Sequence, residues 1–577
     1  MREFLAQHGE VRKVIVKGIM KIKTFKMKNF RGYLDEAVIN FNNFTAFVGK
    51  NDVGKSTILD ALDLFFNEGK NVVKYDKNDI CKRCEEGDEV ELTVVFDGSD
   101  LPPKVVIDAS YETTLEDEHL LNGDGDLEIT KRISPGGKIK TYVHALHPVS
   151  EDLGKNHESL LYYKNNDLKT LLDKYPQALQ PLDANGGAES TRIKNTNAKM
   201  RRLLWNCSDI HFENKMLLID ATKQDAKAIW EKLRQFLPLY SLFESDRNNV
   251  DGDEEIQDPL KIATKEVLKD ESLQESLQDI YLKVSQRLRT VASGTVEKLK
   301  ELDDQAANSL HPVIPDLPDL KWADVFKNVS IAGDQDIPMN KRGSGVRRLI
   351  LFSFFRAEVE RRDEDNNSVG TIYAIEEPET SQHTHNQILL AKALKKLSQK
   401  DNTQVIITTH SAAVVKELQF DDIRLVRDTN CEKQIRKVDP EVIHGSWNEI
   451  NYLAFEECNE EYHNELFGRL QQLINRKSIA KMDDWLSEQT DYDFDTTDDS
   501  HQNFYGDKNN PHKDYTMTAY IRNYIDHPTV DNSHRLKPEY NEIEESIKFM
   551  RYLIQREEAE GTHSNEINEA SKATIVN

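Results

Sequence analysis

Apolar residues in the first quarter of the chain gather into short runs separated by polar stretches. Five runs rich in Ile, Val, Phe and Thr predict β-strands: 21–25, 45–48, 90–96, 127–133 and 139–143. The last two are separated by Ser134–Gly137, a turn sequence that predicts a β-hairpin. A helix that continues through Phe66 follows the second run. This order of elements predicts an α/β domain that begins near residue 20.

Further along the chain the pattern turns helical and then returns to strands. Between about 150 and 325, one apolar stripe steps by three or four positions: Leu273, Leu277, Ile280, Val284, Leu288 and Val291. The stripe fits a short coiled-coil arm and a core-facing bundle helix equally well. Strand patterns return in three places: 329–331, 371–375 and 404–408. Beyond about 440 the pattern is helical again, and we interpret an acidic run at 483–500 as a solvated linker.

These changes of pattern predict four segments. Residues 1–150 form the first half of a split α/β domain, and residues 326–438 form its second half. Residues 151–325 form a helical insertion with room for a dimerisation surface. Residues 439–577 form a separate, all-helical C-terminal domain.

Composition narrows the classes of function. The 76 Lys and Arg against 101 Asp and Glu leave a net charge of −25, which opposes charge-driven coating of nucleic acid or anionic membranes. The longest apolar stretch, 349–355, is far shorter than the roughly 20 residues that span a bilayer. Five sparse cysteines argue for a reducing compartment. The sequence therefore predicts a cytoplasmic protein with no membrane segment.

The strongest chemical motif lies between the run 45–48 and the helix that follows it. It reads Gly49, Lys50, Asn51, Asp52, Val53, Gly54, Lys55 and Ser56, with Thr57 next, and fits G-x-x-x-x-G-K-[ST]. Glycines let backbone N–H groups surround phosphates, and a helix N-terminus favours negative charge. Lys55 is expected to reach the β- and γ-phosphates, and the Ser56 hydroxyl to ligate Mg²⁺. The motif predicts an ATP site.

A nucleotide site also needs acidic residues at a second strand end. The apolar run 371–375 closes on Glu376 and Glu377. We expect Glu376 to hold the Mg²⁺ shell and Glu377 to orient and deprotonate the attacking water. A Glu pair after a strand is often a solvated turn, but together with the phosphate loop the catalytic interpretation is favoured.

Two further segments are expected of an ABC-type ATPase head. Ser344 and Gly345 lie in a basic, glycine-containing segment that leads into a helix. In an ABC dimer such a segment covers the γ-phosphate held by the other subunit. The run 405–409 ends on His410, which is placed to contact the γ-phosphate.

Taken together, these motifs resemble the ATPase heads of the SMC, RecF and OLD-type group over about residues 20–430. The residues that carry the resemblance are Lys28–Gly32, the phosphate loop, Ser344-Gly345, Glu376–Glu379 and Thr408–Ser411. The long insertion is similar to bacterial phage-defence ATPases, among them PtuA of Septu and some retron systems. The group's glutamine-loop residue has no counterpart here, and Asp79 is our substitute for positioning a metal-bound water.

The resemblance implies an ABC-type head, a mixed sheet with flanking helices, split by a helical arm. It also implies that two copies, in a homodimer or higher homo-oligomer, enclose two ATP molecules with Mg²⁺. Its PtuA branch implies a sensor and regulator of a nuclease partner, an HNH protein of the PtuB kind, in antiviral defence. Contact with nucleic acid, or with the RNA and DNA of a retron, fits the same role.

Two alternatives stay open. Arg522 and His527 have the Arg-Asn-x-x-x-His spacing that resembles HEPN-domain ribonucleases, so the tail is a candidate nuclease. A RecF-like DNA-repair ATPase is the second alternative. We do not expect the TOPRIM nuclease of OLD and Gabija-type relatives, because the Asp-x-Asp spacing at Asp491–Asp495 has no apolar strand before it.

Overall fold

The computed structural model of the chain describes most of its predicted elements. The described residues are 20–70, 72–100, 113–153, 159–179, 196–244, 370–380, 382–429, 432–438, 446–492, 515–526 and 537–574, with a few more between 273 and 286. The chain divides into two compact units, Met1–Val438 and Asp439–Asn577, each with its own hydrophobic core. The predicted strand 329–331, the Ser344-Gly345 segment and the second half of the apolar stripe (Val284, Leu288 and Val291) lie outside the described residues, whereas Leu273, Leu277 and Ile280 of the stripe are described and helical.

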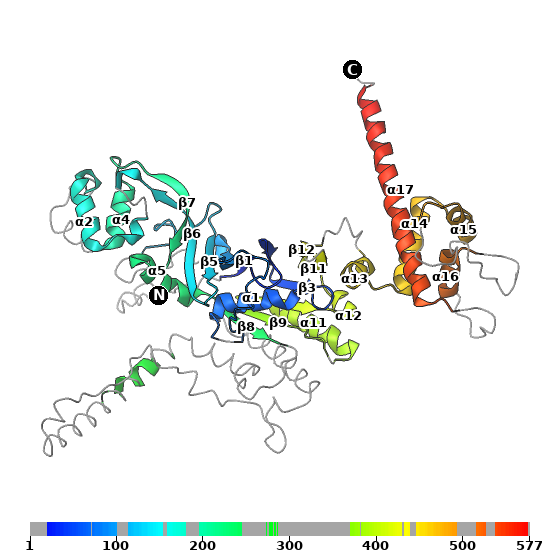
Figure 1. Cartoon of the computed structure of the whole chain (residues 1–577), viewed down its shortest axis with the longest axis horizontal. Helices are drawn as coiled ribbons and strands as arrows, with labels where there is room; N and C mark the ends of the chain where they lie inside the picture. Colours follow the sequence, from blue (N-terminus) through cyan, green and yellow to red (C-terminus); the bar gives the residue numbers. More distant parts are fainter. Residues whose placement is uncertain are drawn as a thin grey trace, which may run out of the picture. The chain divides into compact units, whose positions relative to one another are not determined.

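One sheet of the first unit is antiparallel throughout (Figure 1). Its strand order is β2 (Ala37–Asn40), β1 (Ile22–Lys28), β4 (Val90–Phe96), β5 (Leu127–Ile133), β6 (Ile139–Val149) and β7 (Glu213–Asp220). Strands β5 and β6 pair from Ile133 opposite Ile139, so the predicted hairpin is confirmed. Gly137 has a φ of 79° in its turn, a conformation that glycine adopts without steric cost.

The second sheet of the first unit is mostly parallel. Its order is β12 (Glu432–Lys437), β11 (Ile423–Thr429), β3 (Phe44–Val48), β10 (Thr403–Thr409), β9 (Thr371–Ile375) and β8 (Leu239–Phe243). Only the β11–β12 pair is antiparallel. Every residue of β3, β9 and β10 is buried, as expected for parallel strands covered on both faces. Because these three strands run the same way, the segments that follow them meet at one edge.

Helix α1 (Lys55–Asn67) packs in the core that both sheets share, which contains Phe47, Leu62, Phe65 and Ile129. Among the described residues, this unit also contains α2 (Asn165–Lys174), α4 (Asn197–Trp205), α5 (Gln224–Leu233), α11 (Thr384–Ser398) and α12 (Ala412–Val415), and residues 276–280 are helical as well. Short 3₁₀ turns occupy Gly98–Asp100, Glu151–Leu153, Leu160–Tyr162, Arg234–Phe236 and Phe420–Asp422. The predicted α/β fold, with helices flanking a mixed sheet, is confirmed.

The prediction that residues 150–325 are helical is wrong in two places. Strand β7 pairs with β6 as the last strand of the antiparallel sheet, and β8 pairs with β9 as the last strand of the other. Met216 and Leu218 of β7 are exposed, so the strand has no strong apolar alternation to reveal it. Its pairing depends on the neighbouring strand, which a local pattern does not show.

The described residues of the second unit are helical, as predicted. The helices are α13 (Trp447–Phe455), α14 (Glu460–Leu473), α15 (Ile479–Ser487), α16 (Met517–Asp526) and α17 (Tyr540–Thr574). The prediction of a solvated linker at 483–500 is wrong at its start, because Asp483 lies buried in α15 and accepts hydrogen bonds from the backbone and hydroxyl of Thr516, both at 2.9 Å. Residues 493–500 lie outside the described residues.

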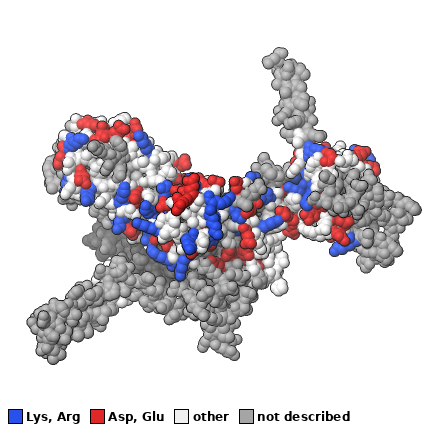
Figure 2. All heavy atoms as spheres, in the orientation of Figure 1, with Lys and Arg blue, Asp and Glu red and all other residues white. Residues whose placement is uncertain are grey.

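Acidic and basic side chains are interspersed over the face of the molecule shown in Figure 2. Within the described part of the chain, no helix combines the length and the apolar character needed to cross a bilayer.

Candidate functional site

The phosphate loop between β3 and α1 is held by contacts from distant parts of the chain. A Cβ atom on Gly49 would lie 2.3 Å from the Val426 carbonyl oxygen of β11, so only glycine fits there. Gly54, with a φ of 100°, accepts a hydrogen bond from the Tyr33 hydroxyl at 3.2 Å. The loop is therefore shaped by its neighbours as well as by its own sequence.

Lys55 lies inside this loop. Its Nζ donates to the carbonyl oxygens of Gly49 at 2.8 Å and Lys50 at 2.7 Å, and the residue is only 4% exposed. Burial lowers the pKa of Lys55, although nearby carboxylates, with Glu377 the strongest, act in the opposite direction. The first turn of α1 contains no acidic residue, and its N-cap residue is Gly54, which has no side chain to cap the helix. A buried cation beside such a helix N-terminus suits a polyanion.

The residue after Lys55 contacts the end of β9. The Ser56 hydroxyl donates a hydrogen bond to the Glu376 carboxylate, and the Glu376 backbone N–H donates to the Phe243 carbonyl of β8 at 2.8 Å. A hydroxyl and a carboxylate oxygen side by side are the hard donors that Mg²⁺ prefers, so this pair fits that ion.

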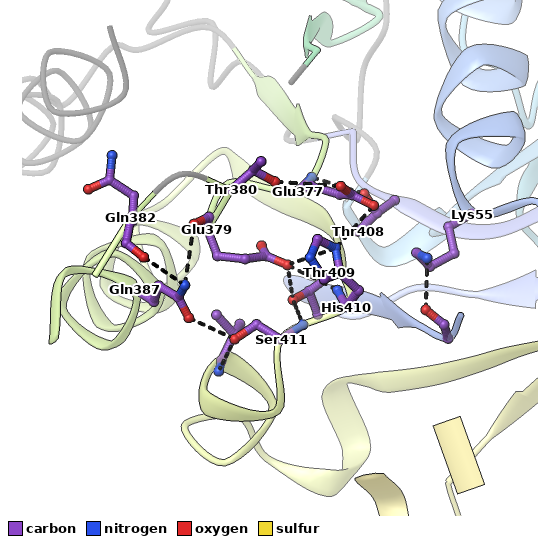
Figure 3. Close-up of polar contacts among 12 residues, drawn as sticks. Lys55, Glu377, Glu379, Thr380, Gln382, Gln387, Thr408, Thr409, His410 and Ser411 are labelled. Atoms are coloured by element: carbon purple, nitrogen blue, oxygen red, sulfur yellow. Dashed lines mark hydrogen bonds and ion pairs between the residues drawn. The ribbon is translucent and has the colours of Figure 1, made fainter. Parts of the chain in front are cut away.

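Glu377 and His410 face each other at the same edge of the sheet (Figure 3). His410 Nδ1 lies 3.3 Å from Glu377 Oε1. Glu377 has a φ of 39°, unusual for a residue with a side chain, and its backbone N–H lies 3.1 Å from both the carbonyl and the hydroxyl oxygen of Thr408. Strained backbone held by such contacts is often found at functional sites.

The family model of the AAA ATPase domain matches residues 20–415, which is more than half of the chain. The chain belongs to this family. The match confirms the predicted ATPase class, and it covers the phosphate loop, both Glu residues after β9 and His410.

Individual relatives of this AAA ATPase domain are distant. Endonuclease GajA of Bacillus cereus (strain VD045) is 22% identical over 421 residues, which cover 72% of this chain and 59% of GajA. This chain therefore spans only about three fifths of the length of GajA. The SMC head domain of Thermotoga maritima has 13% identity and a TM-score of 0.30, with 73% of this chain and 100% of that chain covered. The Smc head of Pyrococcus furiosus, bound to the C-terminal domain of ScpA, has 15% identity and a TM-score of 0.32, with coverages of 75% and 100%.

The remaining predicted ATP-binding residues of the AAA ATPase domain fall into two groups. Asn51, Asp52 and Val53 complete the phosphate loop, and Thr57 continues α1. Ser344 and Gly345 lie outside the described residues.

Asp79, our substitute for the missing glutamine, forms an ion pair with Arg31 at 2.8 Å and accepts from the Asp76 backbone N–H. Its contacts therefore hold the turn after β1, and the described structure gives no support for a role at the metal.

The candidate nuclease residues lie in the second unit. Arg522 pairs with Asp526 on the same helix, donates to the Asn464 side chain at 3.2 Å and covers the Phe467 ring. These contacts tie α16 to α14. His527 lies outside the described residues, so the ribonuclease hypothesis stays a prediction. Asp491, the first residue of the Asp-x-Asp spacing, pairs with Arg556 at 2.8 Å.

Sequence reasoning gave no role of their own to three residues that the fold brings to the AAA ATPase site, although one of them lies inside the Glu376–Glu379 motif that carries the family resemblance. They are Tyr33, which contacts Gly54; Lys433, whose Nζ donates to the Asp52 carbonyl at 3.1 Å; and Glu379, which contacts the turn at His410. Only the resemblance of Lys28–Gly32 to the family pointed near Tyr33. No motif pointed to Lys433.

Proposed function

We propose that this chain hydrolyses ATP where β3, β9 and β10 end, and that its nucleotide state controls a nuclease partner in antiviral defence. The observation that carries the proposal is the convergence of the Lys55–Ser56 pair, the Glu376–Glu377 pair and His410 at one edge of the parallel sheet. These residues come from three segments of the chain, and the predicted chemistry needs all of them together.

In this proposal Lys55 and the loop bind the β- and γ-phosphates. Ser56 and Glu376 hold Mg²⁺, which when bound neutralises phosphate charge. Glu377 orients a water molecule and accepts its proton as the water oxygen attacks the γ-phosphorus. The bond to the β–γ bridging oxygen breaks, ADP leaves, and His410 contacts the γ-phosphate.

The active assembly is proposed to be a dimer. The resemblance to the SMC, RecF and OLD-type group supports this arrangement, with Ser344 and Gly345 of one copy covering the triphosphate bound by the other. The order of the two halves, with the phosphate loop before and Glu376 after the insertion, fits the same architecture.

The partner is proposed to be an HNH nuclease of the PtuB kind, with PtuA as the model for this chain. The likeness to GajA, a protein named an endonuclease, supports a link to nuclease function. The 22% identity and the partial coverage do not carry the endonuclease activity over to this chain. The PtuA assignment rests on the resemblance of the insertion.

Two variants test the ATP site. Lys55→Ala removes the buried ammonium, so we expect binding of a fluorescent ATP analogue to be lost. Glu377→Gln keeps the side chain's shape but removes the base, so we expect ATP-bound dimers to accumulate in light scattering while phosphate release falls. Lys70→Ala, at an exposed position after α1, is the matched control. Normal turnover in both site variants would discard the proposal.

A further inference from the structure

We infer that Glu379 is a positioning residue for the proposed hydrolysis, because its carboxylate fixes the turn that carries His410 relative to Glu377. The inference rests on the proposed function and adds a residue to it. Glu379 follows Glu377 by two positions and lies on the turn after β9 (Figure 3).

Glu379 is almost fully buried, at 2% exposure. Its Oε1 accepts a hydrogen bond from the Thr409 hydroxyl at 2.6 Å and another from the His410 backbone N–H at 3.0 Å. Hydrogen bonds to a charged acceptor are shorter and stronger than neutral ones. The carboxylate therefore holds the end of β10 and the first residue beyond it.

The same oxygen also lies near the imidazole. His410 Nδ1 is 3.7 Å from Glu379 Oε1 and 3.3 Å from Glu377 Oε1, so the ring faces two carboxylates. This arrangement favours a hydrogen on Nδ1, directed toward Glu377. Glu379 acts on the ring through position and charge and does not itself need to touch substrate.

A second set of contacts closes a loop around this turn. The Ser411 backbone N–H donates to the Thr409 hydroxyl at 3.1 Å, and the Ser411 hydroxyl donates to the Gln387 side chain at 2.8 Å. Gln387 in turn donates to the Glu379 carbonyl at 3.4 Å. Helix α11 thus links the turn after β9 to the turn after β10, with Glu379 in contact with both.

Burial of this carboxylate is costly for the fold. Its second oxygen, Oε2, is buried and has no hydrogen-bond partner among the described residues. An uncompensated buried acceptor destabilises a protein. A role confined to packing would be served better by a neutral side chain, and this cost is the expected signature of a site in which charge is needed.

The test compares Glu379→Gln with Thr409→Ser and Thr409→Val. Gln keeps the size of the side chain and an acceptor oxygen but removes the charge, so we expect kcat for ATP to fall by about 10- to 100-fold, with KM changed less than about twofold. Thr409→Ser keeps the hydroxyl and is expected to hold near wild-type kcat. Thr409→Val removes the hydroxyl donor and is expected to lower kcat.

A double-mutant cycle separates positioning from general structure. If Glu379 acts through His410, adding Glu379→Gln to His410→Ala causes no further loss of kcat. An equal, multiplicative loss in the His410→Ala background, or wild-type kcat in Glu379→Gln, overturns the inference. If thermal unfolding measurements show that Glu379→Gln does not fold, the same double-mutant cycle is run with Thr409→Val and His410→Ala. A wild-type chain that does not hydrolyse ATP refutes the proposed function instead.

Discussion

Ser56 and Glu376 lie 320 positions apart in the sequence, and the Ser56 hydroxyl donates a hydrogen bond to the Glu376 carboxylate. The contact joins the first turn of α1 to the end of β9. Both oxygens are suited to the same cation, so the pair unites the two halves of the proposed Mg²⁺ site.

Replacement of Ser56 with Ala removes one proposed ligand without adding bulk. We expect the Mg²⁺ concentration that supports half-maximal ATP hydrolysis to rise about tenfold or more, since a lost ligand or its support typically costs 10- to 100-fold in metal affinity. Titration of Mg²⁺ in a phosphate-release assay measures the change. Ser99→Ala, in an exposed turn, is the control, and an unchanged Mg²⁺ dependence in Ser56→Ala would refute the assignment.

Gly49→Ala should disturb the loop through sterics alone. The added Cβ would lie 2.3 Å from the backbone oxygen of Val426, so β11 or the loop must shift. We expect a loss of about 1–3 kcal/mol in the free energy of unfolding, together with weaker ATP binding. Gly136→Ala is the matched control, because a Cβ there meets no atom within 4 Å. Urea unfolding compares the two, and equal stability would contradict the prediction.

Lys433→Met removes the donor to the Asp52 carbonyl but retains most of the apolar stem. Asp52 has a φ of 63°, so this hydrogen bond helps to hold an unfavourable backbone conformation in the loop. A net hydrogen bond contributes about 0.5–1.5 kcal/mol, which predicts roughly 2- to 10-fold weaker ATP affinity. Isothermal titration calorimetry measures this change in ATP affinity. Lys437→Met, farther along β12, should bind ATP like the wild type.

His463 makes the stability of the second unit depend on pH. Burial, with a smaller contribution from Arg522, lowers the pKa of His463 to about 3 from its ordinary 6.5. Below about pH 6.5 the unfolded chain binds a proton that the folded chain does not, so stability is complete above 6.5 and falls toward pH 3. His463 therefore contributes a slope of up to about 1.4 kcal/mol in the free energy of unfolding per pH unit.

We expect His463→Gln to flatten that slope in urea unfolding between pH 7 and 5. The exposed His211→Gln serves as control and should keep the wild-type slope. A slope in His463→Gln as steep as that of the wild type would show that other groups cause the acid sensitivity.

Arg522→Ala distinguishes packing from catalysis in the second unit. Its contacts with Asn464, Asp526 and Phe467 predict a loss of about 1–2 kcal/mol in stability, as for other broken polar contacts. Lys477→Ala, at an exposed position, should have no effect.

The ribonuclease hypothesis predicts a different result for the same residue. RNA cleavage by the wild-type chain would then be lost in Arg522→Ala and His527→Ala, with ATP hydrolysis intact. Cleavage that survives His527→Ala would refute it.

The sequence by itself determined the phosphate loop, the buried strands and the acidic and histidine strand ends. Each of these is a local property: glycine spacing, continuous apolar runs, and polar residues placed directly after them. The hairpin at Ser134–Gly137 was predictable for the same reason, because turn chemistry acts over four residues.

Only the tertiary structure decided which of these segments meet and what supports them. The order β3–β10–β9 brings Glu377 to His410, and β11 and β12 bring Val426 and Lys433 to the loop. The pairing of strands β7 and β8, the burial of Asp483 and the contacts of Glu379 likewise depend on partners far away in the chain. A local sequence pattern indicates which kinds of interaction a residue is able to make, whereas strand pairing and burial determine which residue it contacts.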